Sequence, residues 1–386
     1  MIDQRELIGT PTRLRRVYGF EEVALVPGAV TADPGEVDLS TDLGGVMLRI
    51  PFLAAAMDAV ADADFAVRLS EAGGLAFVNL EGLYTRYEDA TSIIERVAAA
   101  ESARQAASVL ADAYAEPIRD ELITALIRRI KDAGGTAAVA TTPASAWHHA
   151  ELAADAGADL FLVQSQVSSA RHISTAGRVL SLADLTGALK VPVLVGNTVS
   201  GEAAYQLMHQ GAAAVFVGVG PGAACTTREV LGIGVPQVSA TLEVAAARDR
   251  YAQETGRYVP IVTDGGMRTG GDIAKAIASG ADAVMLGSPF AAAVEAPGRG
   301  INWGMAAPSP TLPRGTRIQI GERLPLKQIL FGPAATMHGT QNLAGALRQS
   351  MAALGARTIR EMHDVEMVVA PSIATEGKSW QLAGRE

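Results

Sequence analysis

The stretch IASGADAVML (277–286) takes the chain from the end of a helical pattern, through a glycine, into a short apolar run. The same phrase occurs twice earlier, as DAGADLFLV (155–163) and HQGAAAVFV (209–217). In each copy, the glycine can adopt the left-handed conformation that ends a helix and lets the chain enter a strand. The repetition therefore predicts a fold built from units in which a helix precedes a strand.

Short apolar runs of this kind recur along most of the chain, each followed by polar or glycine residues and then by a helical pattern. Runs that are apolar on both faces are typical of strands in a buried parallel sheet, with right-handed helical crossovers. Eight such units indicate an α/β protein with a TIM (β/α)8 barrel, although a doubly wound open sheet has the same pattern. The predicted strands are 52–57, 75–79, 136–141, 160–164, 191–197, 214–220, 260–266 and 283–288.

Composition narrows the class of protein. The chain has 386 residues, 49% of them hydrophobic, and no low-complexity linker, so we expect one barrel domain over residues 1–386. A net charge of −9 argues against a nucleic-acid-binding face. The N-terminus is charged, no uncharged apolar run reaches about 18 residues, and a single cysteine cannot form an intramolecular disulfide. These features predict a cytoplasmic protein without a membrane partner.

Two segments interrupt the alternation of strands and helices. Residues 84–130 are charged and helical in pattern, and they form an extended connection between the second and third predicted strands. Residues 295–334 are rich in proline and glycine and follow the eighth predicted strand. A long loop at that end of a barrel covers its mouth, so we expect 295–334 to act as an active-site loop.

The only cysteine, Cys225, lies in GVGPGAACTTREVLGIGVPQ (218–237), just after the sixth predicted strand. A lone cysteine in a glycine-rich turn is often a small buried apolar side chain. In a barrel, however, catalytic groups lie where the strands end. A thiolate at this place can attack an electrophilic carbon and form a covalent intermediate, so we favour a nucleophile at Cys225.

Six separated segments together resemble the IMP dehydrogenase and GMP reductase family. They occur in the family's order and cover about residues 17–370, with 84–135 the weakest part. Full-length dehydrogenases of this family carry a paired CBS module after the second strand. Only 84–130 stands in that place, so the chain is most similar to short members that lack the module. The segments are GFEEVALVPG (19–28), EVDLSTDL (36–43), IPFLAAAMDAV (50–60), 218–237, TDGGMRTGGDIAKAIASGADAVMLGSPFA (263–291) and EAPG (295–298).

The resemblance implies NAD-dependent oxidation of IMP to XMP, a step of guanine nucleotide synthesis in purine biosynthesis. Cys225 would attack C2 of the purine with help from Thr227. Asp264 would bind the ribose hydroxyls, and the purine nucleotide monophosphate would contact Met57, Gly266, Gly287, Ser288, Gly304 and Met305. The cofactor would lie against Gln164, Ser165, Asn197, Gly218 and Gly220. A potassium ion would bind the carbonyls of Gly220, Gly222 and Cys225. The resemblance also implies a homotetramer or octamer.

The chain departs from the family pattern at several positions. Gln164 stands where the dehydrogenases have an aspartate near the nicotinamide, and Ala55 and Ala223 replace serines. The loop after Met305 lacks the Arg-Tyr pair that helps to activate water, and Arg314 replaces an acidic residue. We hypothesise that Arg314, or with less support Arg317, supplies the missing arginine. The alternative is a solvent-exposed loop arginine.

Two other functions stay open from the sequence. An NADPH-dependent GMP reductase needs a proton carrier for the departing ammonia, and the loss of the acid at position 314 argues against it. A catalytically weak paralogue that only binds purine nucleotides is the third possibility. The presence of Cys225 and Thr227 argues against that interpretation, whereas Gln164, Ala55 and Ala223 are compatible with it.

Overall fold

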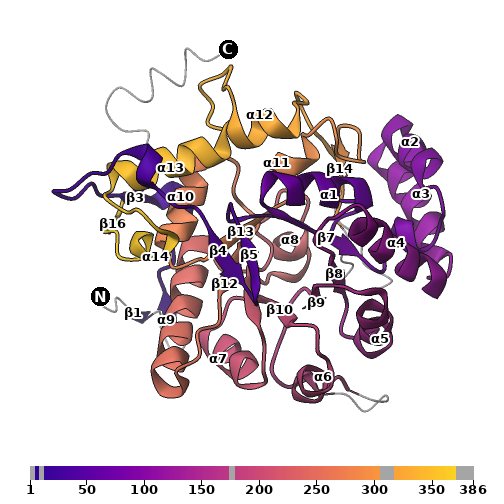
Figure 1. Cartoon of the computed structure of the whole chain (residues 1–386), viewed down its shortest axis with the longest axis horizontal. Coiled ribbons are helices and arrows are strands. Elements are labelled where there is room, and N and C mark those ends of the chain that lie inside the picture. The colour runs from indigo at the N-terminus through magenta and orange to yellow at the C-terminus, as the bar shows by residue number, and fades with distance from the viewer. Residues whose placement is uncertain (1–4, 8–12, 174–178, 305–316, 371–386) are drawn as a thin grey trace.

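Eight parallel strands close into a barrel in a computed structural model that describes residues 5–7, 13–173, 179–304 and 317–370 (Figure 1). Seven barrel strands lie within predicted apolar runs, and the eighth, β10, extends one residue beyond its run to Thr198. Closure of the sheet excludes the open-sheet alternative. The fold is a TIM barrel. Its strands are β6 (Phe52–Ala54), β7 (Leu75–Asn79), β8 (Ala138–Thr141), β9 (Leu160–Gln164), β10 (Val193–Thr198), β11 (Ala214–Val217), β12 (Ile261–Asp264) and β13 (Ala283–Leu286).

The helices between these strands surround the barrel (Figure 1). Gly157, Gly211 and Gly280, the glycines of the repeated phrase, have φ angles of 87°, 96° and 101°, so the predicted left-handed turns are present. At Gly280 a Cβ would lie 2.5 Å from the Cβ of Ala245, which also requires glycine. The helices are α1 (Ala63–Ala72), α5 (Ala146–Ala156), α6 (Leu182–Ala188), α7 (Gly201–His209), α9 (Gln237–Thr255) and α10 (Gly270–Ala278), with α13 (Leu343–Ala353) packed on α10.

The interior of the barrel is filled by apolar side chains, among them Leu53, Phe77 and Phe216. A hairpin of β4 (Thr41–Leu43) and β5 (Val46–Leu48) adds Leu43 and Leu48 to this cluster. A Cβ added at Gly44, in its turn, would lie 3.3 Å from the Cβ of Ala213 and 3.7 Å from the side chain of Leu160, which places the turn beside the starts of two barrel strands. The hairpin therefore closes the amino-terminal end of the barrel and leaves the carboxyl end for chemistry.

The connection between β7 and β8 is helical, as its charged pattern predicts. It contains α2 (Thr91–Ala99), α3 (Ala103–Ala115) and α4 (Asp120–Asp132). Helices α2 and α3 pack on each other beside α4 (Figure 1). Trp303 is buried among them and donates from its indole nitrogen to the Tyr114 hydroxyl at 3.1 Å. This helical pair is thereby attached to the segment that follows the eighth barrel strand.

The proline-rich segment 295–334 is not loop throughout. Strands β14 (Ile301–Asn302) and β15 (Ile318–Gln319) pair antiparallel, and α12 (Leu326–Phe331) follows them. Further along, α14 (Ile359–Met362) precedes β16 (Met367–Val369), which pairs antiparallel with β3 (Val23–Leu25). Within the described ranges, no helix is both long and apolar enough to cross a membrane.

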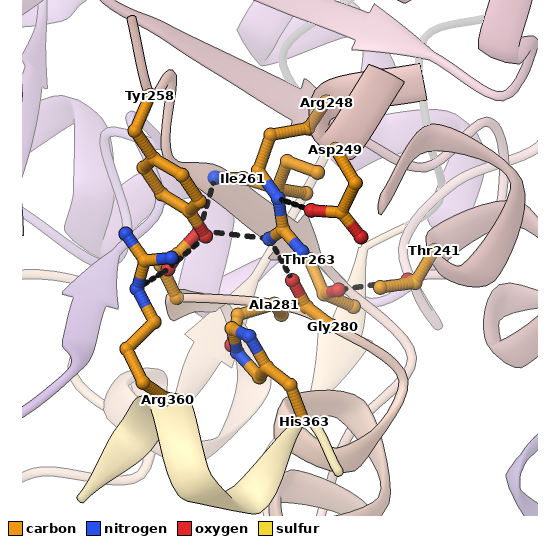
Figure 2. A network of polar contacts seen from close by, with 11 residues as sticks. Thr241, Arg248, Asp249, Tyr258, Ile261, Thr263, Gly280, Ala281, Arg360 and His363 are labelled. Carbon is orange, nitrogen blue, oxygen red and sulfur yellow. Dashed lines mark hydrogen bonds and ion pairs between the residues drawn. The ribbon is translucent and has the colours of Figure 1, made fainter. Parts of the chain in front are cut away.

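A buried polar network stabilises the amino-terminal side of β12 and β13 (Figure 2). Arg248 on α9 donates to the carbonyl of Gly280 at 2.6 Å and to the carboxylate of Asp282 at 3.3 Å. The Tyr258 hydroxyl and the Ile261 amide donate to the same carboxylate, at 2.7 and 2.8 Å. Burial and the neighbouring Asp282 raise the pKa of the Tyr258 hydroxyl above its ordinary value, so it stays a donor.

Replacing Arg248 with methionine should lower the free energy of unfolding by about 2 kcal/mol, because Asp282 keeps two donors but loses a buried positive partner. We expect a fall of several degrees in Tm, measured by circular dichroism. Arg250→Met is the matched control, since Arg250 lies on the same helix with its side chain 59% exposed. Equal effects of the two substitutions would contradict a stabilising role for the buried network.

Candidate active site

Three polar side chains meet at the carboxyl end of the barrel. Gln164 is the last residue of β9, Asn197 lies near the end of β10, and Asp264 is the last residue of β12. The side-chain amides of Asn197 and Gln164 donate to Asp264 Oδ2 at 2.7 and 3.1 Å. Gln164 Nε2 also donates to Asn197 Oδ1 at 2.8 Å. The three residues are far apart in sequence and meet because parallel strands end at one face.

Burial raises the pKa of Asp264 to about 6, while the hydrogen bonds from Asn197 and Gln164 oppose the rise. The carboxylate is therefore mostly ionised at neutral pH. It can accept hydrogen bonds from hydroxyl groups of a ligand, which is the chemistry expected of it. Its titration lies close enough to neutral pH to be measured.

Gln164 carries an amide where the family pattern has an aspartate. Because this amide donates to Asp264, the difference affects the pKa of Asp264. Gln164→Asp would place a second carboxylate beside Asp264 and raise the pKa of Asp264 further, because two like charges at this distance repel. We expect Tm to fall by a few degrees at neutral pH and to recover as the solution is acidified. Gln164→Asn is the size-matched neutral control, and an equal loss in both variants would contradict this electrostatic account.

Cys225 is exposed, which excludes the alternative of a buried structural thiol. Its sulfur lies 3.1 Å from Oγ1 of Thr227, the first residue of α8 (Thr227–Leu231). Thr227 is fully buried. The turn that carries the thiol is closed by a hydrogen bond of 3.0 Å from the Cys225 amide to the Gly222 carbonyl. The sequence therefore places an accessible sulfur beside a fixed hydroxyl group.

Two glycines of this loop are required by close contacts. Gly218 has a φ of 149°, and a Cβ there would lie 2.4 Å from the carbonyl oxygen of Asp264. Gly220 has a φ of 72°, and a Cβ there would lie 2.7 Å from Cγ of Arg228. Contact of Gly218 or Gly220 with a cofactor stays a prediction, because packing alone explains both residues.

The predicted phosphate-binding positions follow β12 and β13. Gly266 is exposed, with a φ of 83°. Gly287 and Ser288, the latter opening α11 (Ser288–Ala291), are partly exposed. A Cβ at Gly287 would lie 3.4 Å from the sulfur of Met57, so Met57 packs over this turn. Four of the predicted substrate residues thus lie at the carboxyl end of β6, β12 and β13.

Of the remaining predicted residues, Gly304 and Ser165 are described by the structure, and two others are not. Gly304 follows the buried Trp303 and is partly exposed, and Ser165 bonds to the Ser168 hydroxyl at 3.0 Å. Met305 and Arg314 lie outside the described residues.

Arg317 donates to the carbonyls of Val97 and Ala100 at 2.9 and 2.7 Å. These contacts hold the guanidinium group at the end of α2. They argue against Arg317 as the arginine that activates water.

Sequence reasoning missed two glutamines. Gln237, 3% exposed, donates from Nε2 to the carbonyls of Val217 and Asp264 at 2.7 and 3.1 Å, joining the ends of β11 and β12. Gln166 donates to Thr227 Oγ1 at 2.7 Å. The position of Gln166, two residues beyond a predicted strand, was the available signal. Its partner is 61 residues away, so only the fold could supply it.

The fold and the site define a TIM barrel with an exposed thiol and a carboxylate at the face where barrel enzymes carry out their chemistry. The IMP dehydrogenase / GMP reductase domain matches residues 17–306. The chain belongs to this family of oxidoreductases, as its sequence motifs predict.

Relatives extend the match over nearly the whole chain. An uncharacterized oxidoreductase of Mycobacterium leprae is 39% identical, with 94% of this chain and 99% of the relative covered. The inosine-5'-monophosphate dehydrogenase of Methanocaldococcus jannaschii is 28% identical over 93% of this chain and 94% of its own length. The crystal structure of an IMP dehydrogenase/GMP reductase-like protein from Corynebacterium glutamicum superposes with a TM-score of 0.89 and 34% identity, covering 94% of this chain and 96% of that one.

Proposed function

We propose that the protein catalyses the NAD-dependent oxidation of IMP to XMP through a covalent adduct at Cys225. The observation that carries the proposal is the exposed Cys225 sulfur 3.1 Å from the buried Thr227 hydroxyl, at the carboxyl end of the barrel. A hydroxyl group at that distance can stabilise an ionised sulfur. The family membership adds the substrate class.

In the proposed reaction, the Cys225 thiolate adds to C2 of IMP, which opens the C2–N3 double bond and places a proton on N3. C2 then loses its hydrogen as hydride and regains its double bond to N3, and a bound NAD would accept that hydride with its two electrons. Water next adds to C2 and releases one proton to solvent, the bond from C2 to sulfur breaks, and XMP leaves while the second water proton restores the thiol. Asp264 orients the ribose, and the turns at Gly266 and Ser288 bind the phosphate.

The residues at the mouth fit a nicotinamide cofactor in part. Gln164 is only partly buried, and although its amide nitrogen is bound, an amide oxygen can accept a bond from a ribose hydroxyl or a carboxamide. Asn197, in contrast, is 7% exposed and donates to Asp264. We therefore propose that the cofactor contacts Gln164 and Ser165 directly. Asn197 would act on the cofactor only through its hydrogen bond with Gln164.

A potassium ion is proposed at the carbonyls of Gly220, Gly222 and Cys225. Carbonyl oxygens are the donors that suit this ion. The Gly222 carbonyl also accepts the amide of Cys225, so the same turn carries the sulfur and the proposed ion ligands. We further propose a cytoplasmic homotetramer or octamer without nucleic-acid or membrane partners, on the family resemblance and the acidic charge.

The test is a rapid-mixing experiment with enzyme, IMP, NAD and potassium, in which NADH absorbance is recorded from the first turnover. We expect a burst followed by steady production, with a slower steady phase when sodium replaces potassium. NADPH consumption with GMP, and no NADH from IMP, would instead favour a GMP reductase. Tight binding of IMP without turnover of either substrate would favour a binding protein.

Arg314 is proposed to assist hydrolysis of the adduct. Arg314→Ala should leave the NADH burst intact and slow the steady phase, since formation of the adduct does not need the arginine. Arg323→Ala serves as a control, because Arg323 already donates to the carbonyl of Val294 at 2.7 Å. A steady phase unchanged in Arg314→Ala would contradict the role.

A further inference from the structure

The hydroxyl group of Tyr114, on α3, joins the helical pair of α2 and α3 to two segments that follow barrel strands. It lies 2.7 Å from Oδ2 of Asp58, the residue after Met57. It also lies 3.1 Å from the indole nitrogen of Trp303, the residue before Gly304. Met57 and Gly304 are predicted substrate contacts. We propose that Tyr114 is a positioning residue that sets both segments against the purine ring of the substrate. The inference deepens the proposed function and rests on it for the purine nucleotide.

The direction of each hydrogen bond follows from the chemistry of the donors. An indole nitrogen only donates, so the Tyr114 oxygen accepts from Trp303. The hydroxyl proton of Tyr114 is directed to the carboxyl oxygen of Asp58, which accepts it. One hydroxyl group is therefore an acceptor toward the segment after β13 and a donor toward the segment after β6. A phenylalanine at this position would lose both bonds.

The same two segments share an apolar cluster with the helical pair, separate from the barrel interior. Ala59, after β6, and Ile301 and Trp303, after β13, are almost fully buried in it together with residues of α2 and α3. Asp58 is 0% exposed and Tyr114 is 8% exposed. Water therefore cannot readily replace the two hydrogen bonds of the Tyr114 hydroxyl, and their loss would shift the segments that they hold.

The Tyr114 hydroxyl is the contact between these segments that lies beside both predicted purine contacts. The segments also meet where the Gly298 amide donates to the Ala59 carbonyl at 3.0 Å. The bonds of Tyr114 end one residue from Met57 and one residue from Gly304. The turns proposed to bind the phosphate belong to other elements, after β12 and at the start of α11. A change at Tyr114 should therefore affect the purine more than the phosphate.

The test compares IMP with ribose 5-phosphate, which has the sugar and the phosphate of IMP but no purine. Tyr114→Phe should weaken IMP binding roughly tenfold, because the segments that contact the purine lose two buried hydrogen bonds. The affinity for ribose 5-phosphate should stay unchanged, since its predicted ligands lie elsewhere. A general loss of structure would instead weaken both ligands. Dissociation constants are measured by calorimetry, with ribose 5-phosphate as a competitor of IMP.

Tyr87→Phe is the matched control, because it removes one hydroxyl group from the same helical connection. The Tyr87 hydroxyl donates to the carbonyl of Ala113 at 3.1 Å, within that connection. This variant should bind IMP like the unaltered protein. If Tyr114→Phe does not fold, Trp303→Phe, which removes one of the two bonds, must show a smaller loss for IMP alone.

Three results would overturn the proposal. They are an unchanged IMP affinity in Tyr114→Phe, an equal loss for ribose 5-phosphate, and an equal loss of IMP affinity in Tyr87→Phe. If Tyr114→Phe weakens IMP binding selectively but IMP and NAD yield no NADH, the proposed function fails and the positioning role stands. If the unaltered protein produces NADH and Tyr114→Phe binds IMP normally, the reverse holds. If the unaltered protein binds no purine nucleotide, both fail.

Discussion

Cys225→Ser is expected to reduce NADH production from IMP by at least about 10³-fold. A serine hydroxyl has nearly the same size as a thiol but is not ionised at neutral pH, so the addition to C2 would be lost. The measurement is the initial rate of NADH absorbance, including the first turnover. Neither a burst nor a steady phase should appear.

Two controls keep this result interpretable. Binding of IMP to Cys225→Ser, followed by calorimetry, should stay within a few fold of the unaltered protein, because the phosphate and ribose contacts are untouched. Ala223→Ser adds a hydroxyl group to the same exposed loop and should retain activity. If Cys225→Ser still produced NADH, hydride transfer would not require the covalent adduct, and the proposed mechanism would be wrong.

Asp264→Asn should weaken IMP binding at neutral pH by roughly 100-fold, because two hydrogen bonds from ribose hydroxyls to a charged acceptor are weakened together. The pKa of Asp264 is raised to about 6 by burial. IMP affinity of the unaltered protein should therefore fall as the pH is lowered through that value, when the carboxylate becomes protonated. In Asp264→Asn this pH dependence should disappear.

The stability of the ligand-free protein should depend on pH in the opposite sense. Because the pKa of Asp264 is higher in the folded chain than its ordinary value of 3.8, the folded state holds this proton more tightly than the unfolded state. The contribution of Asp264 to the free energy of unfolding is thus greatest at low pH and is lost as the pH rises to about 6. Asp264→Asn should lack this decline in chemical-denaturation curves.

Asp155→Asn is the matched control for both measurements, since Asp155 is exposed on α5. It should change neither the affinity for IMP nor the pH dependence of unfolding. If Asp264→Asn bound IMP as tightly as the unaltered protein, Asp264 would not be the ribose ligand.

The sequence by itself determined a covered parallel sheet built from eight strand–helix units, whereas its closure into a barrel rather than an open sheet was decided by the tertiary structure. Eight runs that are apolar on both faces can only be buried in a covered parallel sheet, and glycines such as Gly157, Gly211 and Gly280 mark the turns before the strands. The placement of Cys225 and Asp264 at the carboxyl end of the barrel was also predictable, because Asp264 lies near the end of the seventh predicted strand and Cys225 lies in the loop after the sixth.

Only the tertiary structure decided how these residues are partnered. The bonds of Gln164 and Asn197 to Asp264, and of Gln166 to Thr227, connect loops from different strands. Likewise, only the structure shows that Arg317 binds a carbonyl at the end of α2, which argues against its role in water activation. The physical reason is that a periodic pattern specifies which face a side chain points to, whereas the direction of a hydrogen bond depends on the three-dimensional closure of the barrel.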